Sequence, residues 1–358
     1  MSPSLKIHSH PENAEARAFC DEFLQTGLPK FVFGRNVRAQ SMGEAIAVDG
    51  FIDDYTKERE FCGRPVVTAD QVPKDALVAS SVTGQPLTAN KRLKALGLRS
   101  VDYFAFKRYA DIPIAPIRHW DQFRIDFAKN RSRYEQVFKL LADDESRRTM
   151  SDLINFRLSY DLSFMDGRTD RQYDQYFEAF LDLAAARESF LDIGCFDGHT
   201  TLEFIKRCPG YDAIHVFEPN PENMITVQGS LAHLPRIVFH PFGVSDRTQT
   251  LRFETQGSHS HISNTGTVLI EVRPLDEAVD RRFTFLKMDI EGQERTALVG
   301  AKHSIARHTP RMAIAAYHKF DDFWRIPEDV LAIHENYRIY MRHYTEGVDE
   351  TVMFFMPD

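Results

Sequence analysis

An α/β fold built on two mainly parallel sheets is predicted by three features of the sequence. Short apolar runs alternate with helical patterns in residues 28–110, and the same alternation returns from Phe190 onward. Strands that alternate with helices form parallel sheets. Between these regions, Pro113 and Pro116 break the pattern, and apolar residues then recur at helical spacing. We therefore expect a small Rossmann-like domain at 1–112, a helical connector at 113–186 and a seven-stranded Rossmann-like domain at 187–358.

The first region, residues 1–112, is predicted to form a small sheet, and its sequence has few features of a nucleotide-binding site. Helices are expected at 12–26 and 91–98, and strands at 30–34, 45–54, 65–68, 75–80 and 101–106. The turn after the first strand has one glycine, Gly34, whereas a dinucleotide site has three. We expect this region to support the larger domain or to dock an acceptor. The alternative is nucleotide binding through Arg35, Arg38, Asp53 and Asp54.

The connector ends in an aromatic stripe. Tyr173, Tyr176, Phe177 and Phe180 stand at i, i+3, i+4 and i+7, the spacing of one helix face. Packing of that face against the second sheet is the expected role of the four rings. The connector as a whole is expected to cover one wall of an acceptor site.

The second region contains regularly spaced strands. They are expected at 190–193, 214–218, 237–240, 284–289, 312–317, 337–343 and 351–356, with a short additional strand at 270–275. The last two are joined by residues 344–350, a connection short enough for an antiparallel hairpin. A seven-stranded sheet that ends in a hairpin is the predicted result.

A glycine turn follows the first strand of this region. The segment LDIGCFDGHT (191–200) runs from an apolar strand through Gly194 and Gly198 into a helical pattern. Glycine lets the backbone pass close to a ligand, where a Cβ would clash. Twenty residues after Gly198 the next strand ends in Glu218, at the spacing of a carboxylate that binds a ribose diol. The pattern predicts a cofactor that contains a nucleoside.

Five segments together resemble the FkbM family of S-adenosylmethionine-dependent methyltransferases. They are LDIGCFDGHT (191–200), VFEPNP (216–221), FGVSD (242–246), FLKMDIEGQE (285–294) and VGAKHSI (299–305). The segments follow in order, and the K-x-D-x-E-G block at 287–292 is the most specific of them. The resemblance implies S-adenosylmethionine as cofactor and O-methylation as the reaction.

The cofactor-binding residues follow from the resemblance and from the rule that open α/β sheets bind ligands beyond the carboxyl ends of their strands. They are Asp192, Gly194, Cys195, Phe196, Gly198, Glu218, Ser245 and Asp246. The backbone of the glycine turn would hold the methionine part, Glu218 the ribose, and Ser245 or Asp246 the adenine. Phe196 departs from the glycine that most methyltransferases of this fold carry there.

Four further residues are expected to be catalytic: Asp289, Glu291, His318 and His343. A hydroxyl must lose its proton during methyl transfer, so a base within hydrogen-bond reach is required. Histidine titrates nearest neutral pH, which suits His318 and His343 for the base. Asp289 and Glu291 would orient or stabilise a protonated histidine. Asp289 could instead bind the cofactor amine, and Glu291 could cap the next helix.

The composition of the chain excludes several classes of binding partner. The net charge of −8 argues against a nucleic-acid acceptor. The sequence contains no run of 18 apolar residues, so membrane insertion is not predicted. The four cysteines form no C-x-x-C pair, which favours a reducing compartment and argues against a disulfide frame or a cysteine zinc site. His259 and His261 form only a weak metal pattern in an expected loop, so no metal is predicted.

The expected function is S-adenosylmethionine-dependent O-methylation of a sugar hydroxyl, in a surface glycan or its nucleotide-linked precursor, by a cytoplasmic enzyme. The acceptor is thus a small molecule or glycan, and the oligomeric state stays open. Two alternatives are a nicotinamide-dependent sugar oxidoreductase and a non-catalytic assembly or binding protein.

Overall fold

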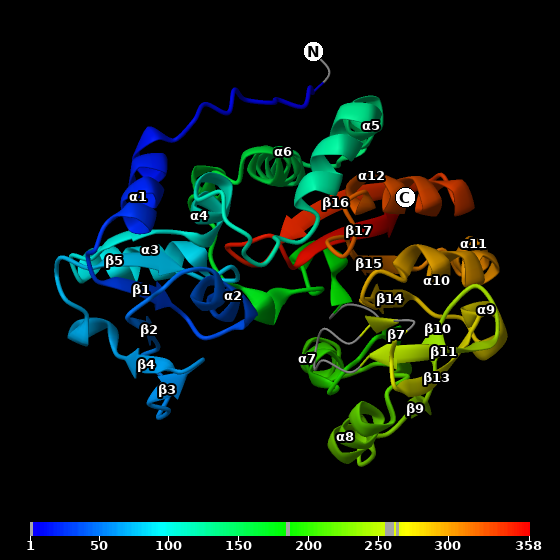
Figure 1. The fold of residues 1–358 in the computed structure, drawn as a ribbon. Coiled ribbons are helices and arrows are strands. Elements are labelled where there is room, and N and C mark those ends of the chain that lie inside the picture. Colours follow the sequence, from blue (N-terminus) through cyan, green and yellow to red (C-terminus); the bar gives the residue numbers. More distant parts are fainter. Residues whose placement is uncertain (1–2, 184–186, 255–260, 263–264) are drawn as a thin grey trace.

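The computed structural model describes residues 3–183, 187–254, 261–262 and 265–358. Figure 1 shows two sheet-containing bodies side by side, with helices of the middle of the chain lying across the top. No helix in these ranges is long and apolar enough to cross a membrane. The observed architecture is the predicted α/β fold.

The first body is a six-stranded sheet with helices packed on it. Its strands are β1 (Lys30–Phe33), β2 (Gly50–Ile52), β3 (Glu60–Phe61), β4 (Arg64–Val67), β5 (Leu77–Ser80) and β6 (Arg99–Val101). Its helices are α1 (Ala14–Gln25), α2 (Val37–Ala45), α3 (Pro86–Ala95) and α4 (Tyr103–Tyr109), and η1 (Ala69–Gln71) is a 3-10 turn. The strand order is β3-β4-β2-β1-β5-β6, and only β3 pairs antiparallel. A small, mainly parallel sheet is confirmed.

Two strand predictions in this body are wrong. The strand expected at 101–106 ends at Val101, because the Asp102 side chain accepts the Ala105 N–H at 3.0 Å and starts α4. Most of α4 is buried, so its sequence lacks the polar face that marks a surface helix. The strand expected at 45–54 covers only β2, because Ala45 still belongs to α2.

Two of the four groups that could meet a nucleotide in this body, Arg35 and Asp53, pair with each other. Asn36 caps α2 by accepting the N–H groups of Arg38 and Ala39, each at 2.9 Å. Arg35 donates to Asp53 at 2.9 Å, just beyond the end of β2. The helix N-terminus and the ribose position are thus satisfied from within the chain.

The middle of the chain is helical at first and then irregular. It contains α5 (Trp120–Leu140), α6 (Asp144–Ser159) and the 3-10 turns η2 (Leu162–Met165), η3 (Gln172–Asp174) and η4 (Ala179–Leu181). The helical stripe predicted for the four aromatic residues from Tyr173 to Phe180 is wrong. Tyr176 has φ 72°, outside the helical region, and separates two short turns. Tyr176 and Phe177 are buried, whereas Tyr173 is 76% exposed.

The second body is built on the predicted seven-stranded sheet. Its strands are β7 (Ser189–Ile193), β8 (Ala213–Phe217), β9 (Ile237–His240), β14 (Phe285–Met288), β15 (Arg311–Ala315), β16 (Tyr337–His343) and β17 (Thr351–Pro357). Their order is β16-β17-β15-β14-β7-β8-β9, and β17 pairs antiparallel with both neighbours. Its helices are α7 (His199–Arg207), α8 (Pro221–Leu231), α10 (Glu294–Gly300), α11 (Lys302–His308) and α12 (Asp322–Ile333). The terminal hairpin is confirmed.

A separate four-stranded sheet lies beside it. The strands are β10 (Gly243–Val244), β11 (Gln249–Glu254), β12 (His261–Ile262) and β13 (Val268–Arg273), followed by α9 (Leu275–Ala278). The additional strand expected at 270–275 is therefore confirmed as β13, but in a sheet of its own. The expected loop at 258–261 lies almost entirely outside the described residues.

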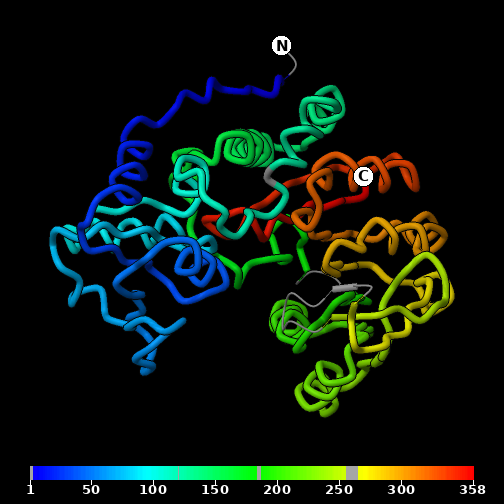
Figure 2. Tube along the Cα trace, viewed as in Figure 1, coloured from blue at the N-terminus to red at the C-terminus, as the bar shows by residue number. Residues whose placement is uncertain are grey.

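One continuous apolar core connects the two bodies. It runs from Phe23 and Val32 through Phe104 and Phe156 to Phe355, so it passes from α4 on the first sheet to α6 on the second. Figure 2 shows the N-terminal segment running over the top of α4 and α6. Chain segments far apart in sequence are thus held in one packed unit.

Polar contacts also join the two bodies. The Glu346 carboxylate accepts the Thr88 N–H at 2.8 Å and the Thr88 hydroxyl at 2.6 Å, at the N-terminus of α3. A Cβ added at Gly347 would lie 1.9 Å from the Thr83 backbone oxygen. The loop between β16 and β17 therefore docks closely against the first body.

Candidate functional site

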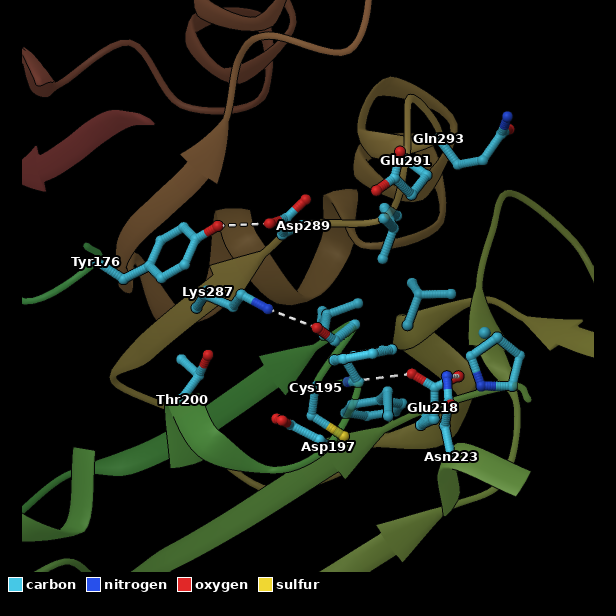
Figure 3. A pocket seen from close by; sticks show the side chains of 18 of the residues that line it. Tyr176, Cys195, Asp197, Thr200, Glu218, Asn223, Lys287, Asp289, Glu291 and Gln293 are labelled. Atoms are coloured by element: carbon cyan, nitrogen blue, oxygen red, sulfur yellow. Dashed lines mark hydrogen bonds between the residues drawn. The ribbon is translucent and has the colours of Figure 1, made fainter. Parts of the chain in front are cut away.

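A cavity of about 410 Å³ opens beyond the carboxyl ends of β7, β8 and β14, a size typical of small-molecule sites. Figure 3 shows the side chains that line it. The cavity lies where the strand-end rule expects a ligand. Its lining includes four of the residues predicted to bind cofactor, namely Gly194, Cys195, Phe196 and Glu218, and also Asp197 and His199 from the same turn. Gly198 stands directly behind this turn as the N-cap of α7.

The glycine turn has the geometry that required glycine. Gly194 has φ +79°, and a Cβ there would lie 1.9 Å from the Asp289 backbone oxygen. Gly198 has φ +84° and packs against Leu231. Phe196 also adopts a positive φ, 53°, without being glycine, and its ring is 39% exposed beside the cavity. Strain of this kind is common at ligand-binding sites.

Glu218 stands at the end of β8 as predicted. Its Oε2 accepts the Phe196 N–H at 3.1 Å, and its Oε1 accepts the Asn220 N–H at 2.9 Å. The carboxylate is therefore fixed against the glycine turn while its remaining lone pairs face the cavity (Figure 3). Burial raises the pKa of Glu218, although the hydrogen bond from Asn220 opposes that rise.

Asp192 lies behind the cavity and does not line it. It is fully buried, accepts a 2.7 Å hydrogen bond from the Thr201 hydroxyl and lies 3.2 Å from Lys287 Nζ. Lys287 also donates to the Gly194 carbonyl at 2.6 Å and lines the cavity. Burial alone would lower the pKa of Lys287, but Asp192, Asp289 and Cys195 together outweigh it and the pKa is raised. Lys287 was visible in the K-x-D-x-E-G block but received no role there.

Asp289 points into the cavity from the end of β14. The Tyr176 hydroxyl donates to its Oδ2 at 2.5 Å (Figure 3), and the Tyr317 hydroxyl lies 3.5 Å from the same oxygen. Its Oδ1 lies 3.4 Å from His318 Nε2. Tyr176 comes from the middle of the chain, so that segment helps to build the site.

The pKa values of His318 and Glu291 are opposite to what their residue types suggest, because the histidine holds its proton more tightly than the carboxyl group does. His318 Nδ1 lies 2.9 Å from Glu294, and Nε2 lies 3.6 Å from Glu291. Burial alone would lower the pKa of His318, but Glu294, Asp289 and Glu291 raise it to about 10. Burial raises the pKa of Glu291 to about 7, although His318 opposes this. Glu291 lines the cavity with φ 54°, whereas His318 stands behind it.

Three predicted residues lie away from the cavity. His343 is buried between Thr351, 2.9 Å from Nδ1, and Thr345, 3.4 Å from Nε2, and burial lowers its pKa. Ser245 and Asp246 follow β10 but do not line the cavity. The corresponding end of the cavity is apolar instead, formed by Val244, Phe253, Ile270 and Val272 together with Phe217 and Pro219.

Sequence reasoning also missed residues from the middle of the chain and from the terminal hairpin. Gln175 Nε2 donates to Glu350 Oε2 at 2.6 Å, and both line the cavity. Burial raises the pKa of Glu350 to about 7. Arg118 and Asp349, with N and O atoms 4.0 Å apart, complete this side. These segments are far apart in the sequence and meet only in the folded chain, so no local spacing could have predicted their contact.

Asp289, Glu294 and His318 offer ligand atoms within 4.8 Å of one another, as a metal site would. Glu294 contacts Nδ1 of His318, however, whereas Asp289 faces Nε2. The two nitrogens point to opposite sides of the ring, so one ion cannot take all three ligands there. A protonated imidazole between carboxylates accounts for the cluster without a metal.

The seven-stranded order with an antiparallel last strand, the glycine turn and the acid after the second strand define a Rossmann-like methyltransferase fold. Residues 192–346 match the model of the Methyltransferase FkbM domain, so this part of the chain is an FkbM methyltransferase domain. The predicted family and enzyme class are confirmed. Methyltransferases of this kind generally use S-adenosylmethionine.

One solved structure shares the fold over nearly the whole chain. A Methyltransferase FkbM from Methylobacillus flagellatus KT is 23% identical, with a TM-score of 0.75 over 96% of this chain and 93% of that one. An rRNA methylase from Streptococcus thermophilus (14% identity, TM-score 0.34) covers 49% of this chain and 91% of its own. A Streptococcus mutans protein in complex with SAH is 11% identical with a TM-score of 0.31, and the match covers 48% of this chain and 92% of that one. The last two likenesses carry no argument at these scores. No curated protein matches the sequence.

Proposed function

We propose that the protein transfers the methyl group of S-adenosylmethionine to a hydroxyl of a sugar, in a surface glycan or its precursor. The FkbM domain supports the methyl transfer. The observation that carries the choice of a hydroxyl is Glu291, a cavity-lining carboxylate whose pKa of about 7 suits proton abstraction near neutral pH.

The cavity fits the cofactor in shape and charge. Gly194 packs so closely on the Asp289 backbone oxygen that a Cβ would not fit there, so the glycine turn and the end of β14 form one continuous wall of the cavity. The lining carries six carboxyl side chains, those of Asp197, Glu218, Asp289, Glu291, Asp349 and Glu350, against two cationic ones, those of Arg118 and Lys287. Such a lining attracts a ligand with a net positive charge, and S-adenosylmethionine carries a sulfonium and an ammonium group.

Each residue has a defined task in this proposal. The Glu218 carboxylate accepts hydrogen bonds from the ribose hydroxyls. Lys287 holds the glycine turn in place by donating a hydrogen bond to the Gly194 carbonyl. The bound cofactor supplies a methyl group activated on a sulfonium. Glu291 takes the proton of the acceptor hydroxyl as its oxygen attacks the methyl carbon, while the C–S electron pair goes to sulfur. Protonated His318 keeps Asp289 and Glu291 in place from behind.

Organisation and location are part of the same proposal. The division at 112/113 and 186/187 remains our proposed set of domain boundaries, with the small sheet, the connector and the methyltransferase domain as its parts. The four cysteines form no C-x-x-C pair, which suits a reducing compartment, so we assign the enzyme to the cytoplasm. The acceptor is a small molecule or glycan and not a nucleic acid.

The test compares glycans by mass spectrometry in cells with the intact gene, without it, and with Glu291→Gln. Loss of an O-methyl mark on a sugar is expected without the gene. Glu291→Gln is expected to lower the methylation rate by roughly 10²–10⁴-fold, because it removes the base.

Exposed Glu335 provides the matched control, since Glu335→Gln makes the same chemical change far from the cavity lining. Methylation must persist in that variant. Sugars with unchanged methyl marks in the strain without the gene would overturn the sugar acceptor. In purified enzyme, the rate should also rise with pH through about 7 as Glu291 loses its proton.

A further inference from the structure

We infer that a second cavity beside the cofactor cavity binds the uncharged, hydroxyl-rich part of the acceptor, with Tyr173 as its aromatic platform. This inference rests on the proposed function. The second cavity measures about 640 Å³ and shares four lining residues with the first, Gln175, Tyr176, His199 and Thr200. A molecule lying across both cavities would therefore pass the Tyr176–Asp289 pair.

The remaining lining consists of groups that bind sugars. It contains the amides of Gln85 and Gln172, the carboxylates of Asp170 and Glu203, and the rings of Tyr173 and Phe177. Amides and carboxylates supply both donors and acceptors for hydroxyls. A nucleobase or lipid pocket would instead be mainly apolar, so this mixture favours a polyol.

Tyr173 has the position and exposure of a stacking platform. Its side chain is 76% exposed, although Tyr176 and Phe177 in the same segment are buried. The backbone there is fixed, because Arg207 donates to the Tyr173 carbonyl at 3.0 Å and Tyr173 lies within the 3-10 turn η3. The flat apolar face of a tyrosine packs against the C–H groups of a sugar ring, while its hydroxyl stays in water.

The charge of the lining excludes a phosphorylated ligand. Asp170 and Glu203 contribute two carboxylates, and the described lining has no lysine or arginine. Arg207 and Lys206 lie nearby, but both are paired with Glu203, and Arg207 also donates to the Tyr173 carbonyl at 3.0 Å, so neither is free to meet a phosphate. A nucleoside diphosphate would meet like charge here. Of the two predicted acceptor forms, the cavity thus selects the neutral glycan over the nucleotide-linked precursor.

The six-stranded body contributes to this cavity through Gln85. Gln85 Nε2 donates to Asp170 Oδ2 at 2.5 Å, so the amide and the carboxylate orient each other across the two bodies. Gln85 is the N-cap of α3, the helix held by Glu346. A role for the first body follows, since it forms one wall of the acceptor cavity and needs no nucleotide to do so.

The test uses the full-length protein, loaded with S-adenosylhomocysteine, on an array of immobilised neutral oligosaccharides, phosphorylated sugars and nucleotide sugars. Four proteins are compared: wild type, Tyr173→Ala, Tyr173→Phe and Tyr55→Ala. Tyr55 is 91% exposed in the first body and serves as the matched control for loss of a surface ring. Calorimetric titration of S-adenosylhomocysteine accompanies each variant.

The inference expects wild type to bind neutral oligosaccharides and Tyr173→Ala to lose at least roughly 10-fold in affinity, as for loss of one stacked ring. Tyr173→Phe and Tyr55→Ala should bind like wild type. Absence of neutral-sugar binding, binding confined to phosphorylated or nucleotide sugars, or full binding by Tyr173→Ala would each overturn the inference. Failure of the proposed function is recognised separately, because then S-adenosylhomocysteine itself does not bind.

Discussion

At the scale of single residues, the environment decides which group can act as a base. His318 is a histidine in a strand-end position, yet three carboxylates surround it and hold it protonated. Glu291 is a carboxylate, yet burial moves its pKa to about 7. Residue type favours His318 over Glu291 as the base, whereas the contacts and burial of the two groups favour Glu291.

The pKa of His318 predicts a pH-dependent contribution to stability. Its folded value is about 10 and its ordinary value 6.5, so the charged form is stabilised by folding. That stability is fully present below pH 6.5 and is lost as the pH rises through 10. His318→Gln should remove it, so the difference in unfolding free energy between wild type and variant should shrink from pH 6.5 to pH 10.

Urea unfolding of both proteins at several pH values measures this difference. A gap that stays constant or widens over that range would contradict a protonated His318. A matched His303→Gln variant, at an exposed histidine on α11, should show no such trend.

At the scale of elements, docking between segments decides what the sequence alone leaves open. The mainly parallel sheets and the terminal hairpin were predictable, because apolar strands alternate with helices at regular spacing. The helix α4 was not, because Asp102 caps a short apolar run, residues 103–106, that resembles a buried strand. The 3-10 turns around Tyr176 were not either, because their φ values depend on contacts such as the one with Asp289.

The contact between Glu346 and Thr88 is the clearest link between elements. Glu346→Ala leaves the N-terminus of α3 without its two hydrogen bonds, so it should lower stability by about 2 kcal/mol. Chemical denaturation measures the loss, with exposed Glu335→Ala as the control. If both variants unfold at the wild-type midpoint, Glu346 does not hold the two bodies together.

At the scale of the whole molecule, the proposed cofactor site was largely predictable from the sequence, whereas the proposed acceptor side was not. Gly194 and Glu218 lie where the motif spacing predicts, because both follow neighbouring parallel strands. Gln85, Tyr173 and Glu350 come from three distant parts of the chain, and no local pattern relates them. Their meeting depends on the shared core that joins the two bodies.

The central claim is that the cavity at the ends of β7, β8 and β14 binds the adenosyl cofactor through Glu218. Calorimetric titration of the full-length protein with S-adenosylhomocysteine tests it most directly. The account predicts saturable binding at one site per chain, weakened roughly 10- to 100-fold in Glu218→Gln and unchanged in Glu335→Gln. No heat of binding with wild type, or equal affinity in Glu218→Gln, would contradict it.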